Sequence, residues 1–441
     1  MLRTIFVVTC ILVGIIASFY GSFYALLFYL WIAYFRPESW LWTDFLQNIS
    51  LSFYVGVFLL VSTAVTGRKF KFNQFTAFLL IIAVQSFIST LLSSHFDICF
   101  SYWVNFLKVL VVSYLITILV TSERELKIVF LLIALSLGFE GAKQGWANMV
   151  LNPGAPNNNE IPFLGDNNCV AVGMLMLVPI FRSLFPSINK RIFKIGFIIM
   201  IVGVVYRALS TYSRGGFLSF CALCVMWWFR SKNKLISLIA IILIAAIILP
   251  IFPQSFWDRM GTISTDENKT DRSAFSRVHF WKVGFDMALN NPLFGVGVYG
   301  YKYEFDKYDY THGEYGTGRS VHSMWFGILS ELGFIGMILF LGIYFYSWYM
   351  CTATRKKCRN IPELSYLANY SSAIEVGLVV CAIGGTFLPF QYVEMLWHYF
   401  ALSSTIYSIA NASYLSMEVA SSNSDAPSRL KFNATNNAVA I

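Results

Sequence analysis

A histidine followed by two glycines at fixed spacing is the strongest candidate for chemistry in this sequence. His322 and Ser323 precede Gly333 and Gly336 in the pattern H-S-x(9)-G-x-x-G. Eleven residues make about three helical turns, so the spacing predicts one helix with His322 and Gly333 on the same face. The glycines would let a neighbouring helix pack beneath an ionisable ring at a membrane boundary, a position typical of functional sites. A histidine that only hydrogen-bonds a backbone carbonyl is the alternative.

Two arginines could bind an anion near this histidine. Arg214 begins a predicted span in the run TYSRGG, where Gly215 and Gly216 leave the backbone open to a ligand, a composition typical of phosphate cradles. Arg277 lies in the first turns of a helix predicted to start at Ser273. A cation there opposes the helix dipole, so an anion beside it would be stabilised. A solvated arginine that aids solubility is the alternative for Arg277.

Two further cations, Arg207 and Lys143, lie toward the outer ends of predicted apolar spans. A charge in lipid costs about 2.5–3.5 kcal/mol unless it is paired or faces a cavity. Both are therefore secondary candidates for binding the same anion. Lys143 has an alternative partner in Glu140, one helical turn earlier.

The composition predicts what kind of protein must position these residues. The 441-residue chain is 57% hydrophobic, only 12% charged, and has a mean hydropathy of +0.62. Such a chain would aggregate unless lipid replaced the surrounding water, so we expect an all-α polytopic membrane protein. Apolar runs long enough to cross a bilayer occur at 50–66, 74–93, 103–121, 126–149, 167–185, 193–209, 215–229, 235–252, 324–350, 370–388 and 394–413.

The first apolar segment, 4–35, is ambiguous, because the run Tyr20-Gly21-Ser22 could divide it into two short helices. The total is 12 or 13 spans, and an inside N-terminus, which requires an even count, favours about 12.

Basic residues orient the predicted spans. Fifteen Lys and Arg residues lie in alternate loops, at 67–73, 122–127, 186–194, 230–234 and 352–366. The positive-inside rule places these loops in the cytoplasm, together with the Asn-, Ser- and Ala-rich tail 414–441, whose composition predicts disorder. Arg214, the loop 253–321 and His322 then face outward. Anionic lipid headgroups explain the net charge of +9, so no nucleic-acid partner is needed.

The outward loop 253–321 is too long to be a simple connection and is expected to carry function. An amphipathic pattern predicts a helix along the membrane surface or capping the bundle. Its apolar positions are Phe275, Val278, Trp281, Phe285 and Ala288.

Three short patterns resemble nucleotide-binding or metal-binding sites but are better explained as ordinary structural features. The run 295–300 spells G-x-G-x-x-G, but no strand-helix-strand unit surrounds it, so we predict a turn. Asp306 and Asp309 could ligate a cation, but basic and aromatic residues interrupt the run, which favours a solvated loop. Cys221 and Cys224 lie inside an apolar helix with no partner pair, which favours packing over metal binding.

Taken together, the residues resemble the O-antigen ligase and polymerase superfamily. The resemblance covers roughly 165–400 and rests on the His322 motif, the run SRGG at 213–216, Arg277, and the run NPLFGVG at 291–297. The runs RPESW at 36–40 and DNN at 166–168 are similar to those of a subgroup described as O-glycosylation ligases. The implied organisation is N-terminal transmembrane helices over 1–166, a ligase-like region over 167–413, and the tail.

The resemblance implies transfer of a glycan from undecaprenyl diphosphate to an acceptor hydroxyl on the periplasmic face of the bacterial inner membrane, without metal or cofactor. It also implies that His322, Arg214 and Arg277 are the essential groups. We predict that His322 is the general base and that arginines bind the diphosphate. The acceptor could be lipid A core, which we favour, a growing polysaccharide or a protein. A flippase or ion-coupled transporter is the alternative from another class, and it should show broken helices or repeats around midplane charges.

Overall fold

The computed structural model describes residues 2–40, 51–261 and 272–434, and 79% of the chain is helical. The described part contains no strand, only one isolated bridge between Ile161 and Gly165. Short 3-10 helices are η1 (Pro37–Trp40), η2 (Phe185–Ser187), η3 (Leu249–Ile251) and η4 (Pro362–Leu364). The α-helices are α1 (Leu2–Ser18), α2 (Ser22–Phe35), α4 (Leu51–Val65), α5 (Gln74–Leu91), α6 (Phe96–Leu119), α7 (Glu123–Leu151), α8 (Asn167–Leu184), α9 (Arg191–Leu209), α10 (Arg214–Arg230), α11 (Lys234–Ile248), α12 (Gln254–Gly261), α13 (Arg272–Asn290), α14 (Tyr301–Tyr308), α15 (Met324–Cys358), α16 (Ser365–Gly385) and α17 (Glu394–Ala434).

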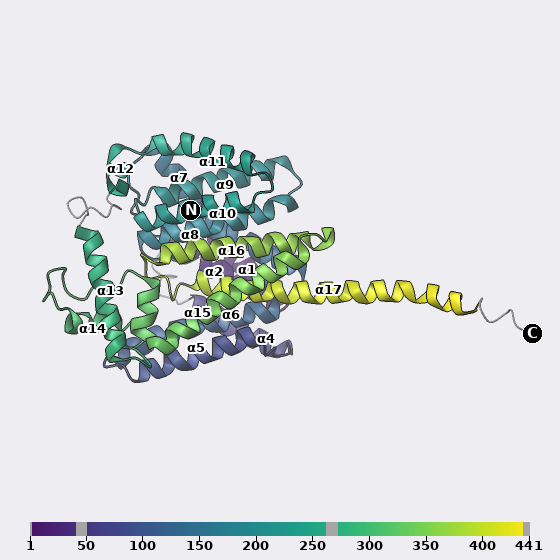
Figure 1. Ribbon diagram of the computed structural model, residues 1–441, viewed down its shortest axis with the longest axis horizontal. Helices are drawn as coiled ribbons and strands as arrows, with labels where there is room; N and C mark the ends of the chain where they lie inside the picture. Colours follow the sequence, from purple (N-terminus) through teal and green to yellow (C-terminus); the bar gives the residue numbers. More distant parts are fainter. Residues whose placement is uncertain (1, 41–50, 262–271, 435–441) are drawn as a thin grey trace, which may run out of the picture.

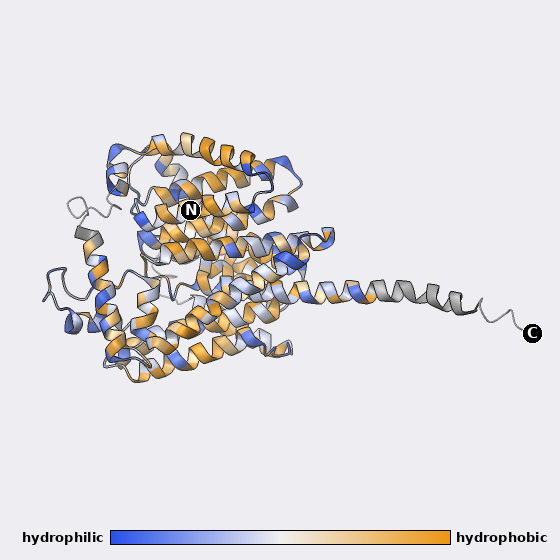
Figure 2. Ribbon diagram, viewed as in Figure 1, coloured by the Kyte–Doolittle hydropathy of each residue, from blue (hydrophilic) through white to orange (hydrophobic). Residues whose placement is uncertain are grey.

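Six of the described helices are long and apolar enough to cross a membrane: α5, α6, α8 with η2, α9, α15, and α16 with η4. Each of the eleven predicted spans coincides with a helix, within a few residues at most ends. Figure 2 shows hydrophobic residues along α9, α10 and α11 and hydrophilic residues at the helix ends. The protein is therefore an all-helical membrane protein, whereas the count of 12 crossings and the outward side of 253–321 stay predictions.

The ambiguous first segment forms two helices, one of the two possibilities that the sequence left open. α1 ends at Ser18 and α2 begins at Ser22, with Gly21 between them at φ 152°. Because such a φ favours glycine, the chain turns there. Both helices are short for a bilayer crossing.

Helices from the region 167–385 form the protein interior together with α2, α6, α7 and α17. α8 packs against α7, α9, α10 and α16, and α15 packs against α16 and α17. All but a few residues of α8 are buried, which explains its unbroken apolar sequence from Cys169 to Phe181. In Figure 1 α13 and α14 lie together at one end of this bundle, and the far end of α17 projects from the opposite end.

The helix after His322 differs from the prediction of one continuous helix with a shared face. α15 begins at Met324, so His322 lies outside it, and Gly333 interrupts it with φ 70° and ψ −173°. A Cβ at Gly333 would lie 2.7 Å from the carbonyl oxygen of Pro292. The predicted alignment of His322 with Gly333 and Gly336 is therefore wrong, because the segment 291–297 inserts where the helix would continue.

Hydrogen bonds satisfy the backbone groups that this break leaves open. The amide of Phe334 donates to the Pro292 carbonyl at 2.8 Å, and the amides of Val296 and Gly297 donate to the carbonyls of Ser330 and Glu331 at 3.0 and 3.1 Å. From α5, Gln85 Nε2 donates to the carbonyls of 293 and 332, and Ser89 Oγ donates to that of 331. Non-helical backbone is tolerated at membrane depth when protein satisfies it in this way. The run 295–300 forms turns, as predicted.

Replacing Gly333 with alanine should destabilise the fold by at least about 2 kcal/mol, because a side chain at positive φ is strained and this one would meet backbone atoms. The measurement is the melting temperature of the detergent-solubilised protein. Gly196→Ala is the matched control, since a Cβ there meets nothing within 4 Å in helix α9. An unchanged melting temperature in Gly333→Ala would contradict the broken helix.

The long loop contains the predicted helix, α13, but this helix is buried on a different face from the predicted one. Phe280, Val283 and Met287 are buried, whereas Phe275 and Val278 are 43% and 46% exposed. The prediction missed this because α13 carries apolar residues on two faces, and the inner face packs against α14 and α15. The outer face remains suited to a membrane surface. Residues 262–271 of this loop lie outside the described part of the chain.

The tail predicted to be disordered begins within α17, which continues to Ala434. Residues 435–441 lie outside the described part. His398 in α17 is fully buried, and its Nδ1 lies 2.9 Å from the hydroxyl of Tyr34, so this histidine has a structural role.

Candidate functional site

His322 lines a polar cavity of about 600 Å³ at the end of the bundle where α13 lies. Arg277 from α13, Arg259 from α12 and Arg319 from the loop before His322 line the same cavity. Glu314 is the one acidic residue among the lining residues, so the cavity carries a positive balance. His322 and Arg277, both candidates from the sequence, thus line the same cavity, and the structure adds two arginines. The other lining residues are Asn168, Ser276, Phe280, Tyr315 and Gly316.

Helix α13 is held in place by a buried contact between a histidine and a carboxylate. His279 Nε2 lies 2.8 Å from Asp309 Oδ1, and both side chains are nearly inaccessible. The ring of His279 also stacks on Tyr315, with centroids 5.1 Å apart, and Tyr315 lines the cavity. Since Arg277 lies two residues before His279, this pair fixes the helix that carries the arginine. His279 is not recognisable from the sequence as a residue that positions α13, because its partner is 30 residues away.

Asp309 is buried and is not the solvated loop residue that the sequence favoured. Its carboxylate accepts hydrogen bonds from the amide and hydroxyl of Thr311 and from the amide of Gly313. Burial alone would raise the pKa of Asp309, but these hydrogen bonds and His279 outweigh it and lower the pKa to about 2. Asp309 therefore stays ionised and paired. The nearby Asp306 accepts the amide of Gly318 at 2.8 Å.

His322 has a strained backbone and a partly buried ring. Its φ is 46°, in the left-handed region that costs a non-glycine residue about 1–3 kcal/mol. Ser323 follows as the N-cap of α15 and accepts the amide of Phe326 at 3.4 Å. Buried Nδ1 of His322 has no hydrogen-bond partner among the described residues. A buried N–H without an acceptor is unfavourable, so this environment favours the neutral ring, which has a free nitrogen.

Electrostatics also favour the neutral imidazole. Burial is the largest cause that lowers the pKa of His322 below 6.5, followed by the positive charge of Arg277 and, more weakly, of Arg319. The negative charge of Asp166, the N-cap of α8, acts in the opposite direction. The neighbouring arginines therefore lower the pKa of His322, and burial contributes more than they do. A neutral imidazole near neutral pH can accept a proton.

The pH dependence of activity should reveal these charges. Activity should fall as the pH drops through the pKa of His322, below 6.5, because protonation removes the base. Arg319→Gln removes a positive charge and should move this acid limb to higher pH. Asp166→Asn removes a negative charge and should move it to lower pH, while asparagine still caps α8. The measurement is the initial rate from about pH 5 to 8; shifts in the same direction for both variants would contradict the assignment.

Arg214 begins α10 next to the cavity but is not among its lining residues. The preceding turn contacts the start of α8, where Asn167 Nδ2 donates to the carbonyl of Thr211 at 3.3 Å. A Cβ at Gly216 would lie 2.5 Å from Cβ of Ala171 in α8, and one at Gly215 would lie 3.2 Å from Cβ of Phe387. The two glycines therefore allow close packing of protein, and the backbone expected to cradle a ligand is covered.

Arg207 and Lys143 do not line the cavity. The fully buried Arg207 guanidinium donates to Gln144 Oε1 at 2.9 Å and to the backbone carbonyls of 157 and 159. It ties the loop between α7 and α8 to α9, which explains how its charge is tolerated. Lys143 Nζ lies 2.7 Å from Glu140 Oε2 and 4.0 Å from the ring centroid of Trp40, so it has the alternative partner that the sequence suggested.

Three lining residues were not predicted as site residues. Arg259 and Arg319 lie in the loop 253–321, whose folding places them beside His322. Arg319 could have been recognised as a site residue from its position three residues before His322. Asn168 belongs to the run DNN that contributed to the family resemblance, and α8 presents it to the cavity from its first turn. No group of three His, Cys, Asp or Glu side chains suited to a metal occurs in the described ranges.

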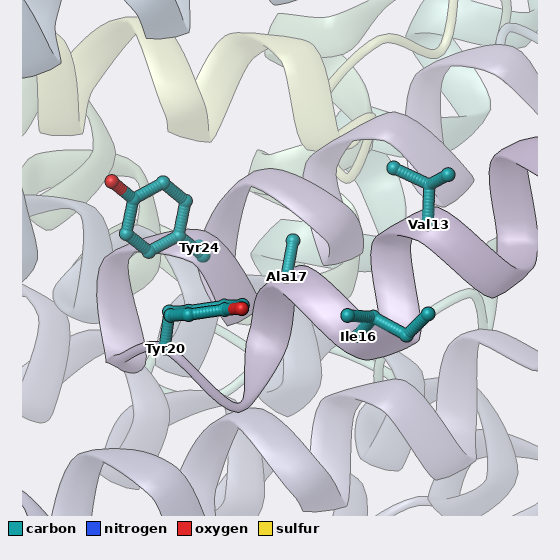
Figure 3. Close-up of a pocket in the computed structure, with 5 residues that line it drawn as sticks. All are labelled: Val13, Ile16, Ala17, Tyr20 and Tyr24. Carbon is teal, nitrogen blue, oxygen red and sulfur yellow. The ribbon is translucent and has the colours of Figure 1, made fainter.

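Another hollow, between the ends of α1 and α2, lacks groups for such chemistry. Figure 3 shows its lining residues, and only the hydroxyls of Tyr20 and Tyr24 among their side chains are polar. Both tyrosines are exposed, at 79% and 46%. This surface is suited to contact with lipid and not to binding a phosphate. The lining residues are Val13, Ile16, Ala17, Tyr20 and Tyr24.

Comparison with known proteins agrees with the position of this cavity. A family model described as O-antigen ligase matches residues 195–341, which include Arg259, Arg277, Arg319 and His322. A second model, for a family of unknown function, matches residues 2–178. A search of the curated proteins found no match. The first family is of a glycosyltransferase-like ligase and polymerase type. The region 195–341, which carries the histidine and three of the arginines, is therefore similar to the O-antigen ligase family.

Proposed function

We propose that the protein is an O-antigen ligase-type glycosyltransferase that moves a glycan from undecaprenyl diphosphate to an acceptor hydroxyl without a metal. One observation carries the proposal: His322 and three arginines line a single cavity inside the region that matches the ligase family. A lipid-linked glycan and an acceptor are the partners that the family implies in general.

The arginines suit the donor's diphosphate. Guanidinium groups stay protonated and can hold phosphate oxygens with two parallel hydrogen bonds. We assign this role to Arg277, with Arg259 and Arg319 on the same cavity, and we retain Arg214 as a contributor from the adjacent end of α10. Arg207 and Lys143 are left out, because their charges are engaged elsewhere in the protein.

The reaction requires a base and a stabilised leaving group. A lone pair of the acceptor oxygen attacks the anomeric carbon while the acceptor's proton passes to the free nitrogen of His322. The bond from that carbon to the diphosphate oxygen breaks, and its electrons remain on the diphosphate beside the arginines. The imidazolium then releases its proton to water. A single direct displacement inverts the anomeric centre.

The positions of the basic loops support a periplasmic site in the bacterial inner membrane. The cavity lies at the starts of α8 and α13, whereas the basic loops 186–194 and 230–234 follow the opposite ends of α8 and α10. The positive-inside rule would place those loops in the cytoplasm and the cavity on the other side.

Reconstitution with separate acceptors tests the reaction. The purified protein in liposomes would receive an undecaprenyl diphosphate glycan with lipid A core, a polysaccharide or a protein acceptor, and release of the lipid diphosphate would be measured. We expect release with lipid A core. Release only with a polysaccharide or a protein would instead identify a polymerase or a protein O-oligosaccharyltransferase. No release with any acceptor would refute the proposed reaction.

A transporter remains the candidate from another class, since α15 is broken at Gly333 beside the buried Glu331. Broken helices near buried charges occur in ion-coupled transporters. Here the break is filled by the segment 291–297 and satisfied by α5, and the matched family is a ligase family. Donor movement across liposomes without lipid diphosphate release would favour the transporter.

A further inference from the structure

A second polar cavity lies at the far end of the same helices, between α8, α10 and α16. Its volume is about 440 Å³. Arg182 from α8, Arg230 at the end of α10 and Lys232 in the following turn line it. Arg182 follows Asn168 by 14 residues in α8, which corresponds to about 21 Å along the helix axis. This cavity is therefore separate from the one that contains His322.

The positively charged side chains at this second cavity outnumber the carboxylates that pair with them. Glu375 of α16 is fully buried, and its Oε2 lies 2.8 Å from Arg230 and 2.9 Å from Arg355. One carboxylate thus serves two arginines, while Arg182 and Lys232 add two exposed charges. The Glu375 pair holds Arg230 against the cavity wall, so part of the cationic lining is fixed in advance. A concave surface of this kind attracts an anion, and arginine suits phosphate in particular.

Apolar side chains complete the cavity and indicate an amphiphilic ligand. Val178, Leu223 and Val376 form its inner wall. Trp227, which is 39% exposed, stands at its edge, and Phe229 on the same helix is 61% exposed. Tryptophan is typical of membrane interfaces, and Phe229 adds exposed apolar surface to α10 that suits acyl chains.

We propose that this cavity binds the phosphate of an anionic phospholipid, with Arg182, Arg230 and Lys232 around the headgroup and the acyl chains along the outer face of α10. Basic pockets between membrane helices are suited to such headgroups. Lipid binding at this cavity does not depend on the proposed glycan transfer. Bound lipid would join α8, α10 and α16 and should stabilise the fold. The opposite end of α8 contributes Asn168 to the His322 cavity.

Lipid binding by the full-length protein tests the proposal. Native mass spectrometry would measure binding of dioleoylphosphatidylglycerol, dioleoylphosphatidylcholine and inorganic phosphate to the detergent-solubilised protein. The test variant is Arg182→Gln with Lys232→Gln, which leaves the Arg230–Glu375 pair intact. The matched control is Lys190→Gln with Arg191→Gln, which removes two exposed charges at the start of α9 and so corrects for general attraction. Arg182→Gln alone provides a milder variant.

The expected result is tighter binding of phosphatidylglycerol than of phosphatidylcholine, a loss of about tenfold or more in the double variant, and a smaller loss in the single variant. The control should change by less than about twofold. Equal losses in test and control variants, or equal binding of the two lipids, would overturn the site. Inorganic phosphate that binds as tightly as phosphatidylglycerol would overturn the assignment to a lipid.

Discussion

Replacing His322 with alanine is expected to reduce glycan transfer by about 10²- to 10⁴-fold while donor binding stays largely intact. The physical reason is that a hydroxyl is a weak nucleophile until a base accepts its proton. The neutral ring of His322 beside Arg277 is the group placed to do so. The measurement is kcat for lipid diphosphate release together with the Kd of the lipid-linked donor, on reconstituted protein.

The left-handed backbone at His322 calls for a second variant and a matched control. Asparagine tolerates positive φ better than alanine, so His322→Asn removes the imidazole with less backbone disturbance. His312 has a similar φ of 51° but is exposed and does not line the cavity, which makes His312→Asn the control. Wild-type turnover in folded His322→Asn would exclude the histidine as the base.

The sequence predicted the helical architecture well because apolar length and periodicity are local signals. The spans from 167–185 to 215–229 agree with α8, α9 and α10 within about two residues. The break at Gly333 could not be predicted in this way. It depends on the segment 291–297, about 40 residues earlier, whose backbone replaces part of the helix hydrogen bonding. A spacing such as x(9) carries no information about which backbone approaches it.

The candidate site was predicted only in part, because contacts between residues distant in the sequence decide which side chains line it. His322 and Arg277 were recognisable from their residue types and positions. Arg319 and Arg259 became candidates only once the loop helices had brought them to one cavity. Arg207 is the opposite case, a candidate from the sequence that does not line the cavity. A buried cation in a membrane span is a functional candidate by default. Here the side-chain oxygen of Gln144 and the backbone carbonyls of 157 and 159 accept hydrogen bonds from the guanidinium instead. Partners distant in sequence decide between these outcomes.

Replacing Arg277 with lysine should lower kcat/KM for glycan transfer by about 10²-fold or more, although the charge is kept. The planar guanidinium can donate two parallel hydrogen bonds to a phosphate, whereas an ammonium acts as a point charge. The loss should appear both in donor Kd and in kcat, because the diphosphate gains charge as the glycosidic bond breaks. Arg214→Lys should also fail if that arginine contributes from α10.

A matched control lies on the same helix as Arg277. Lys282 is exposed on another side of α13 and lines a different, more apolar hollow with Val278 and Phe285. Lys282→Gln removes a positive charge close to the membrane surface but should keep kcat/KM within about twofold of the wild-type value. If Arg277→Lys and Lys282→Gln were equally active, the cavity arginine would act only through general charge. Bidentate phosphate recognition would then be the wrong explanation, because lysine supplies the positive charge but not the two parallel N–H donors.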